Sequence, residues 1–210
     1  MGGEKQVKEK KKEEIPKLTE KDIQNTYNLF LNNFFKEMNV KVTEELKEMG
    51  ERVKEIFSRK DLTDDQKIKM IDNEVISFAK EESSYCFAPI EWNISGKGKV
   101  SFFVTNEKGK RIDYLKGNEQ YLRKELLSKA RDQHCKGILN FFKDPEQIRL
   151  NLDVGTESEE LNTLYHDTLA KTLSEKYEGL ISFEHQEFKD VVVAKWVGPP
   201  REEKKIEFEK

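Results

Sequence analysis

The stretch PIEWNISGKGKVSFFV, residues 89–104, separates two patterns of apolar residues in this chain. Before Pro89, apolar residues recur at helical spacing over roughly seventy residues. After Pro89, apolar and polar residues alternate along 90–94 and 100–104, which is the pattern of strands with one buried face. The glycine-rich residues 96–98 lie between these two runs and predict a tight turn. The sequence therefore predicts a helical part followed by a part that contains a sheet.

Three helices are predicted in the first part. The first begins at Thr19, the second at Thr43 and the third at Thr63, where Gln66 completes a capping box. The connections between them, such as residues 39–41, are short, so neighbouring helices are expected to pack antiparallel. Their apolar stripes comprise Ile23, Tyr27, Phe30, Phe34 and Met38, then Leu46, Met49, Val53 and Ile56, and finally Ile68, Ile71, Val75 and Phe78.

Short strands and two helices are predicted in the second part. The strands are expected at residues 90–94, 100–105, 110–115, 148–154, 180–184 and 191–196, and the helices at 118–142 and 157–177. The predicted fold class is α+β, with an N-terminal antiparallel three-helix segment followed by a mixed β-sheet of about five strands with two packed helices.

The chain is expected to divide into two tails and two folded parts. These are a charged flexible tail at 1–17, a helical segment at 18–88, an α+β domain at 89–198 and a charged C-terminal tail at 199–210. Residues 85–88 are too few and too apolar for a flexible linker, so we expect the two folded parts to share one core.

Composition predicts a soluble protein of a reducing, cytoplasmic compartment. Of the 210 residues, 38% are charged and 35% hydrophobic, and the 13 phenylalanines require a core. Only Cys86 and Cys135 are present, which is unlike a disulfide scaffold. No apolar run approaches the roughly 18 residues that span a bilayer, and the charged N-terminus lacks the apolar region of a secretory signal. We therefore expect no membrane insertion.

Charge is distributed unevenly along the chain. Residues 96–143 contain twelve Lys or Arg and five Asp or Glu, so they carry +7, and the remainder carries −10 to reach the net charge of −3. A basic surface of this kind attracts phosphates, which makes the segment a candidate binding region for RNA or DNA. The alternative is that these side chains only solvate a hairpin and pair with the acidic residues of 157–160. The candidate binding residues are Lys97, Lys99, Lys108, Lys110, Arg111, Arg123, Lys124 and Arg131.

Motifs for metal or covalent catalysis are missing from the sequence. The histidines His134, His166 and His185 show no HExxH or paired spacing, and no CxxC occurs. His134 and Cys135 are neighbours on a predicted helix, where adjacent side chains diverge by about 100°, which disfavours a Cys–His pair. The glycine-rich residues 96–99 lack the P-loop spacing and precede a strand. We therefore predict no cofactor and no metal.

Two patterns of nucleic-acid proteins match the second part incompletely. Residues 99–104 place a basic residue before two aromatics, as an RNA-recognition motif does, but Val100 replaces the glycine of that motif and Asn106 its last aromatic. The order of elements after Pro89 is also that of ribonuclease H-like folds, whose carboxylates bind metals, although a first-strand aspartate is missing. The weak catalytic candidates under this hypothesis are Glu91, Glu119 (or Glu125) and Asp153.

The sequence favours a non-enzymatic protein-binding or assembly protein whose partner is another protein. This interpretation depends on the aromatic-rich helical stripes, which exceed the needs of one small bundle, and on the missing catalytic motifs. Nucleic-acid binding through residues 96–143 is the alternative hypothesis, and metal-dependent cleavage of phosphodiester bonds is the third.

Overall fold

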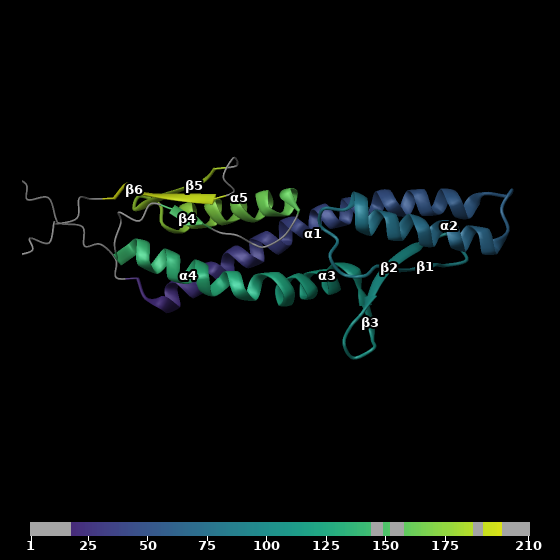
Figure 1. The fold of residues 1–210 in the computed structure, drawn as a ribbon, viewed down its shortest axis with the longest axis horizontal. Coiled ribbons are helices and arrows are strands. Elements are labelled where there is room, and N and C mark those ends of the chain that lie inside the picture. Colours follow the sequence, from purple (N-terminus) through teal and green to yellow (C-terminus); the bar gives the residue numbers. More distant parts are fainter. Residues whose placement is uncertain (1–17, 144–148, 152–157, 187–190, 199–210) are drawn as a thin grey trace, which may run out of the picture.

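The computed structural model describes residues 18–143, 149–151, 158–186 and 191–198, so the predicted tails at 1–17 and 199–210 lie outside it. The organising element is α1 (Glu20–Ser58), a helix of 39 residues. At 1.5 Å per residue its length is about 58 Å. Figure 1 shows α1 running along the molecule, with the other elements packed along its sides. Within the described residues, no helix combines the length and the apolar character needed to cross a membrane.

The predicted break between the first two helices does not exist. Residues 39–41 are helical, and Thr43 lies inside α1, where its Oγ1 donates a hydrogen bond to the Asn39 carbonyl at 2.6 Å. Threonine satisfies its hydroxyl in this way inside helices, and no Gly or Pro interrupts this stretch. The predicted N-terminal antiparallel three-helix segment is therefore wrong. Instead, α1 and α2 (Asp64–Ser77) form a helical hairpin, which the π-helical turn η1 (Phe78–Glu82) extends.

In the described part of the chain, six short strands form two separate antiparallel sheets. The first sheet has the order β1-β2-β3 and consists of β1 (Glu91–Ile94), β2 (Val100–Thr105) and β3 (Arg111–Asp113). The second sheet has the order β4-β6-β5 and consists of β4 (Arg149–Asn151), β5 (Ile181–Gln186) and β6 (Val191–Trp196). The prediction of a single mixed sheet is therefore wrong.

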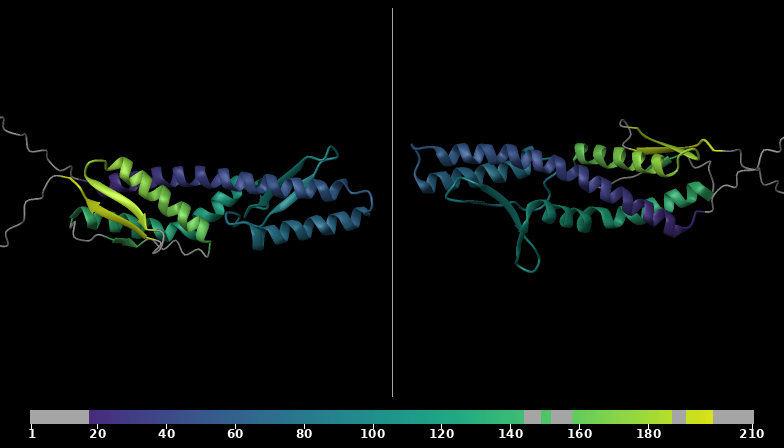
Figure 2. Two further views of the ribbon diagram at one scale, coloured as in Figure 1. Left: turned by 90° about the horizontal axis from the view of Figure 1, so that it is seen from above. Right: turned by 180° about the vertical axis from the view of Figure 1, so that it is seen from behind.

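The two sheets stay apart because a long helical run separates them in the chain. It consists of α3 (Tyr114–Leu122), the π-helical η2 (Arg123–Leu127) and α4 (Ser128–Lys143). These 30 residues carry the chain about 45 Å from β3. Figures 1 and 2 show the first sheet beside α2 near one end of the molecule, and the second sheet beside α5 (Glu159–Lys176) near the other end.

α1 is the shared wall of one aromatic-rich core. Near its start, Phe30 and Phe34 pack against Tyr165 of α5, with ring centroids 4.8 and 5.4 Å apart. Near its end, Gly50 lies beside the side chain of Phe102 from β2. Buried residues from both predicted folded parts belong to the same hydrophobic cluster, because α1 contacts α2, α3, α4 and α5 along its length.

Asn118 of α3 holds the segment that joins the helical hairpin to the first sheet. Its buried side chain accepts hydrogen bonds from the backbone N–H groups of Phe87 and Ala88 at 2.7 and 3.0 Å. It also donates a hydrogen bond to the Tyr85 carbonyl at 2.6 Å. These three bonds satisfy backbone groups that would otherwise lose water without compensation, so residues 85–88 form a fixed joint.

Candidate functional site

A groove of about 580 Å³ lies between the β2–β3 hairpin and α3, within the segment predicted to be basic. Its apolar lining consists of Ala88, Pro89, Val104, Ile112 and Gly117. Its polar lining consists of Thr105, Asn106, Glu107 and Lys108 from the hairpin and Gln120, Tyr121 and Lys124 from the helical run. Cavities of about this size, with apolar walls and a few polar groups, are typical of ligand sites. We call this site the hairpin groove.

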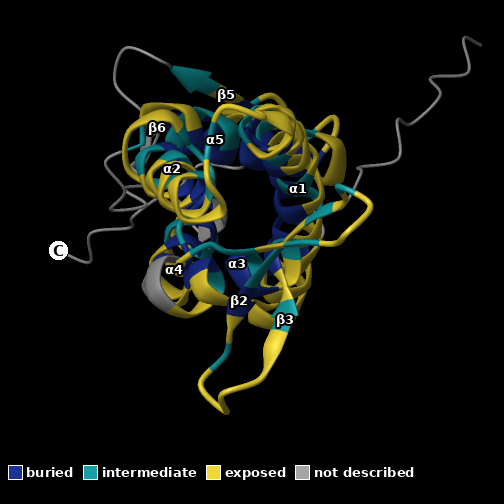
Figure 3. Ribbon diagram, turned by 90° about the vertical axis from the view of Figure 1, so that its right-hand side faces the viewer, coloured by how far each residue is buried: buried dark blue, intermediate teal, exposed yellow. Residues whose placement is uncertain are grey.

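Both walls of the hairpin groove are held by local features of the sequence. Asn106 accepts hydrogen bonds from the N–H groups of Lys108 and Lys110 at 3.0 and 2.9 Å, which closes the hairpin turn. Gly109 has a φ of +71°, a conformation that favours glycine. The tip of this hairpin projects from the body of the molecule and is exposed (Figure 3).

The opposite wall depends on close contact between α3 and β2. A Cβ atom on Gly117 would lie only 1.8 Å from Cγ1 of Val104, so the absence of a side chain at Gly117 lets the helix reach the strand. Tyr121, one turn further along the helix, also lines the groove and keeps 43% of its surface exposed. The groove therefore combines an apolar base that is only partly buried with an accessible aromatic side chain.

One ion pair connects the two walls across the groove. Lys124 of η2 pairs with Glu107 of the hairpin, and this ammonium group lowers the pKa of the Glu107 carboxyl. Both side chains are exposed, so the pair contributes little to folding stability. The pair instead places two opposite charges next to the apolar lining of the groove.

Four of the eight predicted basic residues are paired with local acidic residues. Arg111 lies 3.5 Å from Glu91, Arg123 lies 2.9 Å from Glu119, Lys124 pairs with Glu107, and Arg131 lies 3.2 Å from Asp132. The two central arginines also stack on aromatic rings, Arg111 on Phe103 at 4.2 Å and Arg123 on Phe35 at 4.0 Å. These partners differ from the acidic residues 157–160 considered from the sequence.

The other four predicted binding residues are lysines of the first sheet, and they form two groups. Lys97 and Lys99 belong to the β1–β2 turn, whereas Lys108 and Lys110 belong to the β2–β3 turn. The six-residue strand β2 runs between the two turns, so they are about 20 Å apart at 3.3 Å per residue. The two lysine pairs therefore lie at opposite ends of the sheet.

The predicted catalytic carboxylates have separate structural partners. Glu91 accepts a hydrogen bond from Thr105 Oγ1 at 2.6 Å, and Glu119 binds Arg123, while Asp153 lies outside the described residues. Within the described part of the chain, no group of three or more His, Cys, Asp or Glu side chains is arranged to hold a metal ion.

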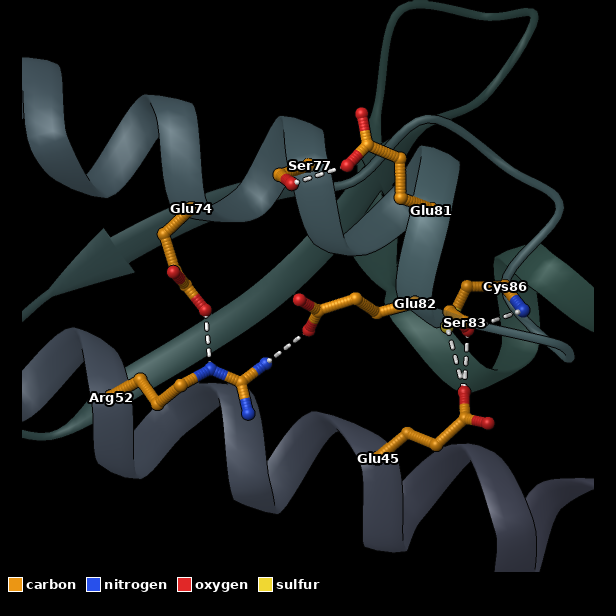
Figure 4. A network of polar contacts seen from close by, with 8 residues as sticks. All are labelled: Glu45, Arg52, Glu74, Ser77, Glu81, Glu82, Ser83 and Cys86. Atoms are coloured by element: carbon orange, nitrogen blue, oxygen red, sulfur yellow. Dashed lines mark hydrogen bonds and ion pairs between the residues drawn. The ribbon is translucent and has the colours of Figure 1, made fainter.

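A network of mostly half-buried polar side chains, shown in Figure 4, fastens the end of α2 to α1. The Glu45 carboxylate accepts hydrogen bonds from Ser83 Oγ and from the Cys86 thiol. Arg52 of α1 pairs with Glu74 of α2 and with Glu82 of η1. Burial raises the pKa of Cys86 to about 12. Since the thiolate is the reactive form, Cys86 is not an activated nucleophile at neutral pH.

The three histidines, which are far apart in the sequence, lie together in the core. His134 of α4 bonds through Nδ1 to Tyr165 Oη at 2.7 Å, and Tyr165 also bonds to Tyr27 Oη at 2.8 Å. His166 of α5 and His185 of β5 lie side by side, with ring centroids 5.1 Å apart. Burial lowers the pKa of His134 to about 3, so this imidazole is neutral near pH 7. The cluster is a polar part of the core.

Comparison with protein-family models, with curated proteins and with solved structures finds no match to this chain. The chemistry of its own surfaces is therefore the guide to its function. Of the features described above, the histidine cluster lies in the core, and the side chains of the Figure 4 network pair with one another between α1, α2 and η1. The hairpin groove is open to solvent and has the composition of a binding surface.

Proposed function

We propose that this chain is a non-enzymatic protein-binding or assembly protein that holds a peptide segment of another protein in the hairpin groove. The observation that carries the proposal is the pairing of an apolar base, in which Pro89 is exposed and Ile112 only partly buried, with the accessible ring of Tyr121. Apolar surface that remains open to water favours association, and an exposed tyrosine supplies contact area at low entropic cost.

The charges around the groove support a partner segment with an apolar anchor beside an acidic residue. Lys108 lines the groove and makes no ion pair within the described part of the chain. An acidic group of the partner would therefore gain a new charge contact there, while an apolar side chain covers Val104 and Ile112. Such contacts orient the partner and increase its association rate more than they increase affinity.

Binding has better support than catalysis because the carboxylate that lines the groove, Glu107, is already paired with Lys124. Asn106 holds the hairpin turn, and Glu107 and Lys124 hold each other. General acid–base chemistry requires a titratable group within hydrogen-bond reach of a substrate proton. The buried Cys86 and His134 belong to other parts of the core.

Nucleic-acid binding along the whole of residues 96–143 has less support than peptide binding. The charges of Arg111, Arg123, Lys124 and Arg131 are offset by neighbouring carboxylates. Binding to phosphates depends on uncompensated cations that lie along one surface.

Photocrosslinking tests the proposal in native cells or extract. A photoreactive phenylalanine analogue replaces Tyr121 in the full chain, and the same analogue at Leu29, an exposed residue of α1, serves as the control. We expect position 121 to yield a discrete crosslinked protein that position 29 does not yield. Identical crosslinking patterns at the two positions, or none at 121, would contradict the proposal.

The purified complex then tests the chemistry of the groove. Tyr121→Ala and Lys108→Glu should each weaken the binding of the crosslinked partner at least about tenfold, which corresponds to about 1.4 kcal/mol. Lys136→Glu is the matched charge control, because Lys136 is exposed on α4 and does not line the groove. Equal affinities for the groove variants and the wild-type chain would reject the hairpin groove as the binding site.

A further inference from the structure

A second pocket lies at the other end of the first sheet, where the β1–β2 turn meets the last turns of α1. It has a volume of about 580 Å³. Three lysines and one phenylalanine are among the residues that line it, and we call it the lysine pocket. Lys54 and Phe57 come from α1, and Lys97 and Lys99 come from the turn, on either side of Gly98.

The glycine-rich sequence builds one side of this pocket. Gly98 has a φ of +73° and donates its N–H to the Ser95 carbonyl at 2.8 Å, so the turn closes tightly. Ser95 also accepts a hydrogen bond from the Lys99 N–H through its Oγ at 3.2 Å. Lys97 and Lys99 are therefore carried on either side of a fixed turn, although the sequence lacks the spacing of a phosphate-binding P-loop.

The lysine pocket has uncompensated positive charge. Lys97 and Lys99 are exposed and make no ion pair with any described residue, whereas Lys54 lies 2.6 Å from Glu51. Carboxylates offset most of the other cations predicted to bind, so this turn differs from the arginines of the same segment. An anion that enters the pocket would contact two lysines without displacing an existing partner.

An aromatic ring lies beside these charges. Phe57 keeps 41% of its surface exposed although it is near the end of a helix that buries many other aromatics. Lys67 of α2 lies over this ring, with its Nζ 5.7 Å from the centroid. An accessible aromatic surrounded by cations is the arrangement that proteins use to stack a base and hold its phosphate.

We infer that the lysine pocket binds a nucleotide unit, with its phosphate against Lys97 and Lys99 and its base against Phe57. The unit belongs either to a free nucleotide or to single-stranded nucleic acid, since both present the same ring and phosphate. The pocket volume lies in the range of small-molecule sites, so one nucleotide unit fits its scale.

A structural role for the two lysines makes a different prediction. The last turn of α1 contains no basic residue, and cations near a helix C-terminus stabilise its partial negative charge. If Lys97 and Lys99 serve only this purpose, their substitution lowers the free energy of unfolding and the wild-type chain binds no nucleotide. Binding and thermal unfolding must therefore be measured on the same samples.

The test is fluorescence anisotropy of a labelled single-stranded oligothymidylate or oligouridylate with the purified full chain at about 50 and about 200 mM salt. We expect saturable binding that weakens at the higher salt concentration. The double variant Lys97→Glu/Lys99→Glu should bind at least about tenfold more weakly. The matched control Lys116→Glu/Lys136→Glu makes the same change of charge at exposed lysines outside the pocket and should bind like the wild-type chain.

Competition experiments test the aromatic contact and the source of the ligand. Phe57→Ala should weaken oligonucleotide binding about fivefold or more through lost stacking, and leave competition by tripolyphosphate unchanged. Competition by a mononucleotide would assign the site to free nucleotides, and competition by oligomers alone would assign it to nucleic acid. Absence of binding at low salt, equal losses in the two double variants, or equal competition by polyglutamate would overturn the inference.

Discussion

The hydroxyl of Tyr165 lies 2.7 Å from Nδ1 of His134, and this contact joins α5 to α4 inside the core. The same hydroxyl lies 2.8 Å from that of Tyr27 on α1, so one polar atom connects three helices. Each of these side chains is at most 1% exposed. A polar connection of this kind adds directional preference to an aromatic core, because its hydrogen bonds are satisfied only in one arrangement of the helices.

We expect folding stability to fall as the pH decreases from about 6.5 toward 3. Burial lowers the folded-state pKa of His134 to about 3 from an ordinary value of 6.5, so between these values the unfolded chain binds a proton that the folded chain does not. Stability should therefore decrease by up to about 1.4 kcal/mol per pH unit from this residue. Tyr27, Tyr165 and His166 are the titratable groups that face His134 from other helices.

Urea unfolding across this pH range measures the effect for the wild-type chain and for His134→Gln. The variant should show a shallower dependence of the free energy of unfolding on pH, whatever its stability at pH 7. Carboxylates contribute to acid unfolding in both proteins, so the difference between their slopes isolates His134. Equal slopes would contradict the assignment.

Tyr165→Phe should lower the free energy of unfolding by about 1–3 kcal/mol. The substitution removes the hydroxyl that contacts both Tyr27 and His134 and leaves buried polar atoms without that partner. Tyr121→Phe is the control, because Tyr121 is exposed and its substitution should change stability by less than about 0.5 kcal/mol. Denaturant unfolding at neutral pH compares the two variants, and similar effects in both would argue against the buried connection.

Asn118→Ala should destabilise the joint between the helical hairpin and the first sheet. The substitution removes the partner of two N–H groups and one carbonyl in residues 85–88, and the expected cost is about 3 kcal/mol. Hydrogen exchange should show faster exchange of the Phe87 and Ala88 amides. The control is Asn140→Ala on the exposed face of α4, which should leave those amides protected.

Gly117→Ala should destabilise the chain although alanine is the better helix former. Replacement of glycine by alanine in a helix favours folding by about 1 kcal/mol, but the new Cβ would lie 1.8 Å from Val104 Cγ1. Overpacking of this kind costs about 1–3 kcal/mol. The double variant Gly117→Ala/Val104→Ala should recover part of the loss measured between the single variants. A Gly117→Ala variant that is more stable than the wild-type chain would contradict the close packing of α3 on β2.

Local signals in the sequence were sufficient to predict where two helices begin. The caps predicted at Thr19 and Thr63 are confirmed, because each hydroxyl accepts the N–H of the third helical residue, Asp22 and Gln66 respectively. Such caps involve atoms within one turn of each other and do not depend on the rest of the fold. The same kind of signal misled at Thr43, where the helix continued and satisfied the hydroxyl internally.

The sequence predicted some residues of the two candidate sites and missed the others. The surplus of positive charge directed attention to Lys97, Lys99 and Lys108, and these residues do line pockets. The opposite walls were not predictable, because Phe57 and Lys54 are about forty residues earlier in the chain than the turn that they face. Nor does a charge count reveal that Arg123 pairs with Glu119.

By itself, the sequence determined the short-range features: the change of pattern at Pro89, the capping boxes, the glycine turns and the uneven charge, because each depends on residues that are close in the chain. The tertiary structure decided that α1 runs unbroken past Thr43, that two sheets form instead of one, and which charges remain uncompensated. These outcomes depend on contacts between distant segments, where burial of the aromatic face of α1 against α5 outweighs local preference.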